Sequence, residues 1–298
     1  VQYIRPEIIG LILGAYVLSM IRGEHQSRGG SSPIIRFILG FFVMIGALIF
    51  LGCPLRMILR LGGGDLNALF GIAGFAGGIG FGTIFLKRGY SLQRTYALSK
   101  LESAMMPAIQ VGLLVLVVTA PAFIFFSQKG PGAMHAPWLI SLAAGIVVGG
   151  LSQFSRLCTV GGFRDLFLFK KSILIFGYLA VLVGVFLVNI SFGNFHLGFE
   201  NQPIAHTDGL WNFLGMALAG FCSVLLGGCP LRQLIMTGEG NSDAAVTVLG
   251  LAAGAAFAHN FGLAASGAGP TLNGQIAVGV GFVVALIIAI LNTKRANA

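Results

Sequence analysis

The sequence predicts an all-α polytopic membrane protein with about nine transmembrane helices, and two observations carry that prediction. Of the 298 residues, 56% are hydrophobic and only 9% are charged, whereas a soluble domain carries about 25% charged residues. Apolar runs of about 18 or more residues, the length that a spanning helix needs, recur along the whole chain. No stretch has the composition of a soluble domain, so we expect residues 1–298 to form a single membrane domain.

Nine apolar segments are candidate transmembrane helices. Several are short for a bilayer about 30 Å thick, so we expect them to be tilted or partly buried in neighbouring helices. We place them at residues 7–21, 33–52, 66–86, 105–126, 138–153, 173–190, 211–228, 243–262 and 273–292. Three further stretches are apolar but too short to cross a bilayer, at residues 53–64, 154–169 and 229–242. Irregular backbone at membrane depth is tolerated only inside protein or a cavity, so we expect re-entrant half-helices there.

The net charge of +9 does not indicate a nucleic-acid partner, because the basic residues neither cluster on one face nor interleave with aromatic residues. They lie mainly in loops, where they indicate how the chain is oriented in the membrane. Cytoplasmic loops of membrane proteins are rich in Lys and Arg. In a nine-span topology the basic groups fall on one side: Arg22, Arg28 and Arg36; Lys87, Arg88, Arg94 and Lys100; Lys170 and Lys171; Lys294 and Arg295. The 191–209 loop, on the other side, has none. We therefore expect an external N-terminus and a cytoplasmic C-terminus.

The most informative feature is a repeat. Gly-Cys-Pro-Leu-Arg occurs at residues 52–56 and again, 176 positions later, at 228–232. At the same spacing, Leu-Gly-Gly-Gly-Asp at 61–65 faces Thr-Gly-Glu-Gly-Asn at 237–241. An odd number of predicted spans separates the copies, so they face opposite sides of the membrane. We expect two inverted-topology pseudo-symmetric halves, 1–126 and 127–298, with a site between them. The competing interpretation is a duplication kept only for packing.

The repeated motif has the chemistry of an anion site. Proline suits the first turn of a helix, which puts Cys53 and Cys229 at N-caps. Free N–H groups and the helix dipole attract anions there and lower the pKa of a thiol. The candidate binding residues are Gly52, Cys53, Arg56, Gly228, Cys229 and Arg232. The simpler alternative, that each cysteine is a small buried hydrophobe, does not explain the duplication.

A second motif, Ser-Gln-Phe-Ser-Arg-Leu-Cys-Thr-Val-Gly-Gly-Phe-Arg-Asp, occupies residues 152–165. It adds Arg156 and Cys158 to the candidates. Arg156 either counters an anion or extends to the membrane interface. If the duplication is complete, the counterpart of Cys158 lies upstream of Val1, and the first half lacks its N-terminal element. Cys222, within a span, is interpreted as packing, and His259 as structural. With no metal-ligand spacing, Walker loop or CxxC, we expect no metal, no cofactor and no enzyme.

With these two motifs, the sequence resembles the YeeE/YedE family of sulfur-transport membrane proteins over essentially its whole length. It is most similar to the YedE branch, described as selenium transporters. The resemblance implies two pseudo-symmetric helical halves whose short helices meet at a constriction, where cysteines relay an ion through S–H···S contacts. Carried over by motif, Cys53, Cys158 and Cys229 are the relay cysteines. A small cytoplasmic sulfur-carrier protein of the TusA type is the partner that the resemblance implies.

These observations favour a transporter or selective channel of the bacterial inner membrane for a thiosulfate-like or selenium anion. A membrane thiol oxidoreductase or sulfurtransferase is the alternative from another class. It needs two cysteines close enough to form a disulfide, and the sequence shows no near-neighbour pair. A third class is an assembly subunit whose cysteines are vestigial.

Overall fold

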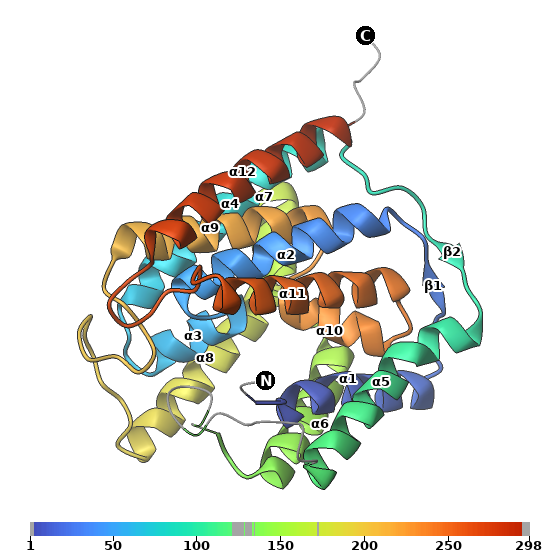
Figure 1. The fold of residues 1–298 in the computed structure, drawn as a ribbon, viewed down its shortest axis with the longest axis horizontal. Coiled ribbons are helices and arrows are strands. Elements are labelled where there is room, and N and C mark those ends of the chain that lie inside the picture. Colours follow the sequence, from blue (N-terminus) through green and yellow to red (C-terminus); the bar gives the residue numbers. More distant parts are fainter. Residues whose placement is uncertain (1–2, 121–127, 129–132, 134, 172, 294–298) are drawn as a thin grey trace. The chain divides into compact units, whose positions relative to one another are not determined.

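The computed structural model describes residues 3–293, except 121–127, 129–132, 134 and 172. The described part contains twelve α-helices and one pair of two-residue strands (Figure 1). The longer helices are α1 (Pro6–Ile21), α2 (Pro33–Phe50), α4 (Asn67–Lys87), α5 (Lys100–Thr119), α6 (Trp138–Ser155), α8 (Ile173–Ser191), α9 (Gly209–Leu226), α11 (Ser242–Asn260) and α12 (Leu272–Leu291). The short ones are α3 (Pro54–Gly62), α7 (Thr159–Phe169) and α10 (Pro230–Gly238). Strands β1 (Arg28–Gly29) and β2 (Tyr96–Ala97) pair antiparallel.

The chain is an all-α polytopic membrane protein. Eight helical stretches of its described part are long and apolar enough to cross a membrane. Three of them join a long helix to the short helix after it: Pro33–Gly62, Trp138–Phe169 and Gly209–Gly238. Each of the nine predicted segments coincides with a helix, although α1, with 16 residues, is shorter than a full span.

Most predicted span boundaries agree with the structure to within two residues, and among the span starts that of α5 differs most. Helix α5 begins at Lys100 rather than 105, because the side chain of Ser99 accepts a hydrogen bond from the N–H of Glu102 and caps the helix there. The end of that predicted span, residues 121–126, lies outside the described residues, as do Lys294 and Arg295. Helix α6 continues to Ser155, so the short helix expected within 154–169 begins at Thr159.

The chain groups into two compact units, each assembled from three segments. Unit 1 comprises Val1–Ser31, Arg94–Arg156 and Arg232–Ala245; unit 2 comprises Ser32–Gln93, Leu157–Leu231 and Val246–Ala298. Each unit draws on both predicted halves, 1–126 and 127–298, and those boundaries stay a prediction.

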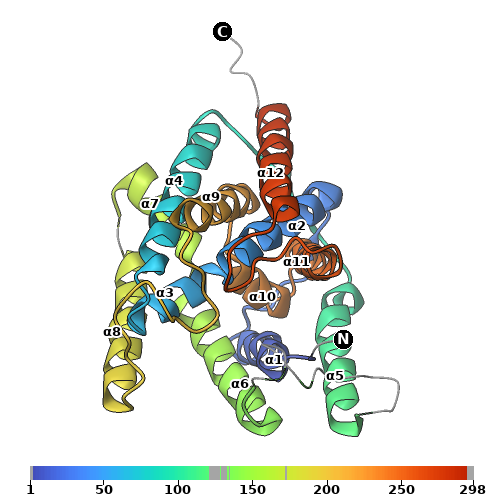
Figure 2. The same cartoon turned by 60° about the vertical axis from the view of Figure 1, so that its left-hand side comes forward.

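In unit 1, α1 packs against α6 through glycines on both helices (Figure 2). A Cβ added at Gly10 would lie 2.6 Å from the carbonyl oxygen of Leu142, and one added at Gly14, Gly145 or Gly149 would also overlap the facing backbone. Small residues at such spacing let helix backbones approach closely in membranes.

Unit 2 shows the repeat as a pseudo-two-fold arrangement. Helices α2 and α9 each have 18 residues, begin 176 positions apart and run antiparallel (Figure 1). Their close approach is at Gly46 and Gly215, where a Cβ on either glycine would meet the carbonyl oxygen of the other. Two equivalent helices that run antiparallel are related by a two-fold axis that is perpendicular to both helices. The arrangement is therefore an inverted repeat.

The helices that follow exchange partners in the same symmetric way. On α4, a Cβ at Gly74 would overlap the carbonyl oxygen of Phe213 on α9. On α11, a Cβ at Gly250 would overlap the carbonyl oxygen of Phe37 on α2. Gly250 lies 176 positions after Gly74, and Phe37 lies 176 positions before Phe213, so the second contact is the first with the two repeats exchanged. The contacts of Gly78 with 217 and of Gly254 with 41 repeat this relation one turn later.

The repeat extends to the turns between helices. In unit 2, the N–H groups of His196 and Gly198 donate to the carbonyl oxygens of Gly63 and Gly64 at 2.9 and 3.0 Å. In unit 1, the N–H groups at 26 and 28 donate to the carbonyl oxygens at 239 and 240, at 3.0 and 3.3 Å. Gly64 and its counterpart Gly240 both have positive φ, +99° and +94°, which glycine adopts without strain.

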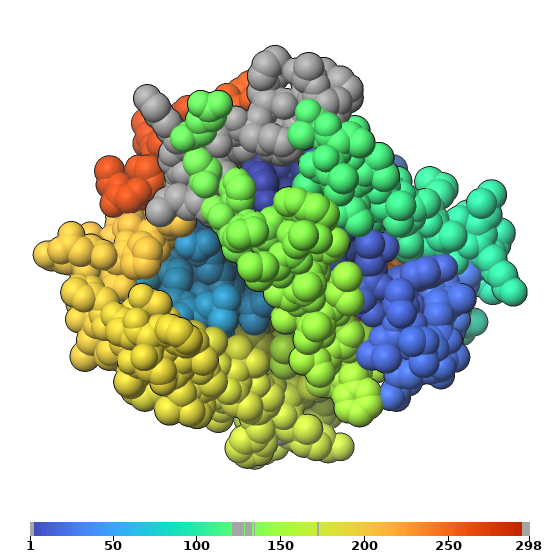
Figure 3. Space-filling view, turned by 90° about the horizontal axis from the view of Figure 1, so that it is seen from below, coloured from blue at the N-terminus to red at the C-terminus, as the bar shows by residue number. Residues whose placement is uncertain are grey.

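Helix α8 is much less buried than α1. Tyr178 is its one buried residue among those described, whereas eight residues of α1 are buried. Many apolar side chains of α8 are exposed, and the segment lies at the surface, yellow in Figure 3. Exposed apolar side chains on a spanning helix face lipid.

The glycine contacts of unit 2 predict that Gly→Ala lowers the melting temperature at a helix crossing and does not lower it elsewhere. Gly74→Ala and Gly250→Ala each place a methyl group into a facing carbonyl oxygen, and such overpacking costs about 1–3 kcal/mol. Both variants should lower the melting temperature of the purified protein in detergent. Gly184→Ala, on α8 where nothing lies within 4 Å of an added Cβ, should leave it unchanged or raise it, because alanine favours the helix. A rise in all three variants would contradict the close approach.

Candidate functional site

All three motif cysteines follow the same kind of turn. Each lies two residues after a residue with left-handed backbone that ends a long helix: Leu51 (φ 62°), Arg156 (φ 56°) and Gly227 (φ 83°). The next helix then starts directly after the cysteine, as α3, α7 or α10. The prediction that Cys53 and Cys229 begin short helices is confirmed. Cys158, in the stretch 154–169 where the sequence predicted a re-entrant half-helix, also begins a short helix.

The two repeated turns agree down to their hydrogen bonds. The N–H of Gly52 donates to the carbonyl oxygen of Ala47 at 2.8 Å, and that of Gly228 donates to Ser223 at 3.1 Å, five residues back in each case. A Cβ at Gly52 would lie 2.9 Å from Cδ of Arg56, so this glycine makes room for the aliphatic part of the arginine. The two predicted glycines therefore shape the turns before the cysteines.

The cysteines sit at helix N-termini. The carbonyl oxygens of Cys53 and Cys158 accept the first helical hydrogen bonds, from the N–H groups at 57 (2.9 Å) and 162 (3.0 Å). The sulfur of Cys158 also accepts a hydrogen bond from the N–H of Gly161 at 3.3 Å and so caps α7. The sulfur of Cys53 makes no capping hydrogen bond but lies close to the N–H groups of Leu55 and Arg56.

The structure brings the three thiols together within unit 2. The thiol of Cys158 lies within hydrogen-bonding reach of Cys229, and Cys53 lies within electrostatic range of Cys229. Cys158 and Cys229 are 6% and 1% exposed, whereas Cys53 is only partly buried. We call Cys53, Cys158 and Cys229 the thiol cluster. Its members come from segments far apart in the sequence, so their proximity is a result of the fold.

Two hydroxyl groups at the thiol cluster were missed by the sequence analysis. Tyr178 of α8 and Thr159 of α7, both buried, share a hydrogen bond between their hydroxyl groups. Tyr178 also lies within electrostatic range of all three thiols. Close packing of α7 on α8 aligns the pair, since a Cβ at Gly161 would lie 2.8 Å from Leu174. The adjacency of Thr159 to Cys158 was the available signal; for Tyr178 there was none.

The predicted arginines do not share one setting. Arg56 belongs to unit 2 with the thiols, whereas Arg156 and Arg232 belong to unit 1. Arg232 donates twice to the buried carboxylate of Glu239, at 3.1 and 3.0 Å. Arg156 bridges Glu239 at 3.1 Å and Glu24 at 2.8 Å. Both arginines are thus held by carboxylates, a use that was not among the alternatives considered for Arg156.

Glu24 is the most densely contacted carboxylate of this group. It accepts hydrogen bonds from Arg22 at 3.1 and 2.9 Å, from Gln153 at 2.7 Å and from Arg156 at 2.8 Å. The hydrogen bonds from Arg22 and Gln153, followed by the charge of Arg156, hold the pKa of Glu24 below its usual value. Glu24 therefore stays ionised at neutral pH and fixes the end of α6 to the loop after α1.

A buried ion pair near the start of α4 was also missed. Arg60 donates to Asp65 at 2.6 Å and to the carbonyl oxygen of Phe50 at 2.5 Å, and both charged side chains are almost fully buried. The ring of His206 shares a hydrogen bond of 2.8 Å with the carbonyl oxygen of Ile49, at the C-terminal end of α2 that also holds Phe50. Burial lowers the pKa of His206 and favours its neutral form. Removing one partner of such a buried pair is strongly destabilising, so we assign it a structural role.

The remaining candidates have structural settings. Cys222 is fully buried in the hydrophobic cluster around α9, as the packing interpretation requires. His259 is exposed near the end of α11. Among the described residues no group of three or more His, Cys, Asp or Glu side chains could hold a metal ion.

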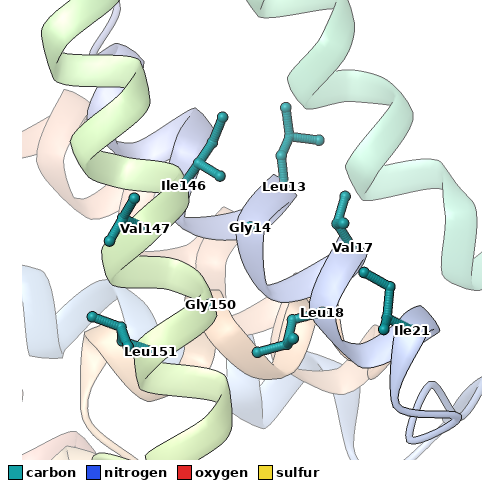
Figure 4. A pocket seen from close by; sticks show the side chains of 9 residues that line it. All are labelled: Leu13, Gly14, Val17, Leu18, Ile21, Ile146, Val147, Gly150 and Leu151. Atoms are coloured by element: carbon teal, nitrogen blue, oxygen red, sulfur yellow. The ribbon is translucent and has the colours of Figure 1, made fainter.

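An apolar groove of about 360 Å³ lies between α1 and α6 (Figure 4). Leu13, Val17 and Leu18 line one side, and Ile146, Val147 and Leu151 line the other, with Gly14 and Gly150 between them. The lining offers no side-chain hydrogen-bond donor to an anion, so this groove is not the candidate site.

No protein-family model matches the chain, and no curated protein matches it at a significant level. The functional argument therefore rests on the thiol cluster itself. Three helix N-termini, each beginning at a thiol, offer N–H donors and polarizable sulfur atoms in a water-poor setting. This arrangement can bind a soft anion without a metal, or perform thiol chemistry between Cys158 and Cys229.

The proximity of Cys158 and Cys229 can be tested by mild oxidation. Treating the purified protein with diamide should link Cys158 to Cys229, because their side chains are within hydrogen-bonding reach and a disulfide needs Cβ atoms about 4 Å apart. Peptide mass spectrometry after digestion identifies the linked pair. Cys222 serves as the internal control and should stay reduced. A dominant product that contains Cys222, or no linked 158–229 peptide, would contradict the geometry.

Proposed function

We propose that this protein is a transporter or selective channel for a small sulfur or selenium anion, thiosulfate-like in chemistry, which passes along Cys53, Cys158 and Cys229. One observation carries the proposal: three thiols, each at the start of a short helix, lie together inside one unit of a polytopic membrane protein. Packing alone accounts for a single buried cysteine such as Cys222. It does not account for three that share the same turn.

The physical requirement is to compensate a charge inside the membrane. Burying an ion without compensation is prohibitively costly, and helix N-termini supply fixed N–H dipoles without carrying a counter-charge. Weak, repeated contacts allow an ion to leave each station as readily as it enters. Thiols meet that requirement, because their S–H groups are weak donors and their sulfur atoms are polarizable.

The cysteines of the cluster differ in exposure. Cys53 is partly exposed, while Cys229 and Cys158 are buried. An anion would reach Cys53 first and the buried pair afterwards. Tyr178 and Thr159 would supply hydroxyl groups beside the buried pair.

The cellular setting follows from the loop charges and the family resemblance. We propose the bacterial inner membrane, with the basic loops at Arg22, Arg88 and Lys170 facing the cytoplasm, together with the C-terminus. A small cytoplasmic sulfur-carrier protein of the TusA type is the partner on that side. The anion and membrane lipids are the other partners, and transport requires no cofactor.

Serine substitution tests the relay. Cys53→Ser, Cys158→Ser and Cys229→Ser should each reduce uptake of radiolabelled thiosulfate into proteoliposomes at least about tenfold, which corresponds to ~1.4 kcal/mol. Oxygen is less polarizable than sulfur, but serine keeps the size and a donor at the helix start, so the melting temperature should change little. Cys222→Ser is the matched control and should transport like the wild type. Undiminished uptake in a variant with serine at all three positions would refute the relay.

The close approach of Cys158 and Cys229 favours a second candidate, a sulfurtransferase. In that reaction a cysteine thiolate attacks the outer sulfur of thiosulfate, forms a persulfide and releases sulfite. The relay forms no such bond. Intact-protein mass spectrometry during transport separates the two: the relay predicts unmodified cysteines and no sulfite, whereas a sulfurtransferase gains the mass of one sulfur atom for each sulfite released.

A further inference from the structure

A polar cavity of about 310 Å³ lies in unit 1, and its lining includes none of the three relay cysteines. Its lining consists of Gly23, Glu24, Gln26, Arg28, Arg156 and Glu239. The apolar grooves at α1 and α6 and at α2 and α12 have hydrophobic linings instead. We call the space between these residues the polar cavity.

The two arginines and two glutamates that line the polar cavity cancel, and a positive excess comes from Arg22 and Arg232, which pair with the two glutamates from outside the lining. Glu24 and Glu239 are balanced by Arg22, Arg156 and Arg232 through the ion pairs described above. Arg28 also lines the cavity, and no side-chain hydrogen bond or ion pair joins it to another residue of the described chain. Four arginines against two glutamates leave a net charge of +2 around the cavity.

The fold does not require these charges, because the same turn exists without them in unit 2. The N–H of Glu24 donates to the carbonyl oxygen of Ser19, and that of Asn194 donates to Asn189, 2.9 and 2.8 Å away. Asn194 is thus the counterpart of Glu24 in the repeat.

The other two charged positions have neutral counterparts as well. The shared hydrogen bonds between the turns make Gly198 the counterpart of Arg28 and Gly63 the counterpart of Glu239. Neutral residues therefore suffice for this backbone. The charges at 24, 28 and 239 serve something other than the turn.

Arg28 and Arg156 both line the polar cavity. The backbone of Arg28 is held by strand pairing with Ala97 and by its N–H bond to the carbonyl oxygen of Gly240. The side chain of Arg156 is 51% exposed, so a ligand can reach it. Guanidinium groups present paired N–H donors that match the oxygens of a sulfate-like ion.

We propose that the polar cavity binds a small doubly charged oxyanion between Arg28 and Arg156, independently of the thiol cluster. The ion would balance the net charge of +2 and share Arg156 with Glu24. Its size fits, because a cavity of about 310 Å³ holds such an ion and several waters of about 30 Å³ each. Glu24 is then a competitor for the arginine, and removing its charge strengthens binding.

Equilibrium dialysis of the full chain in detergent with radiolabelled sulfate tests the site. Arg28→Gln should weaken sulfate binding about tenfold, the effect of losing one charge-assisted contact. Glu24→Gln should tighten it, because Arg156 is released from its competing carboxylate. Arg5→Gln is the matched control: Arg5 is an exposed arginine of the same unit, paired with Glu7 at 3.3 Å, and its loss should not change binding.

The variant with serine at Cys53, Cys158 and Cys229 keeps this test separate from the relay. It should bind sulfate like the wild type even if it transports nothing. Binding that survives Arg28→Gln unchanged would overturn the proposal, as would a wild-type protein that binds no sulfate. Binding lost in the serine variant but kept in Arg28→Gln would assign the anion to the thiol cluster, overturn the polar cavity and leave the relay standing.

Discussion

The structure of unit 2 depends on backbone contact between helices that carry glycine at the crossing. Gly74 on α4 lies against the carbonyl of Phe213, and Gly250 on α11 lies against that of Phe37. In lipid there is no hydrophobic force between helices, so packing at this distance is what holds them. Because the two contacts are equivalent under the repeat, each half of the pseudo-symmetric core completes the other. The breaks after α2 and α9 then fall at symmetric positions.

Those breaks explain how helix N-termini come to lie beside the thiols of a membrane protein. A long helix ends in a left-handed residue, two residues later a cysteine begins a short helix, and the first N–H groups of that helix have no partner within the helix itself. The third cysteine, Cys158, reaches the same region through α7, whose packing on α8 also places Tyr178 there. Thiols and hydroxyl groups gather there, and Arg56 lies within electrostatic range of Cys53.

The sequence was sufficient for features that depend on local pattern. Hydrophobic length predicted the nine long helices, and the duplicated Gly-Cys-Pro-Leu-Arg predicted both the inverted repeat and the helix starts at Cys53 and Cys229. Features that depend on distant partners were beyond it. The approach of Cys158 to Cys229, the carboxylates around Arg156 and Arg232, and the inclusion of Tyr178 arise from tertiary packing. Helix periodicity carries no information on which of several apolar faces meet, so no motif could have indicated them.

The central claim is that the thiol cluster binds the transported anion, and locating that anion tests it most directly. Crystals of the protein soaked in selenosulfate, examined at the selenium absorption edge, report the position of the selenium atom by its anomalous scattering. The account predicts a peak in contact with the sulfur atoms of Cys158 and Cys229, which Cys229→Ser abolishes while the fold stays the same. A peak elsewhere in the protein, with none at the thiols, would contradict it.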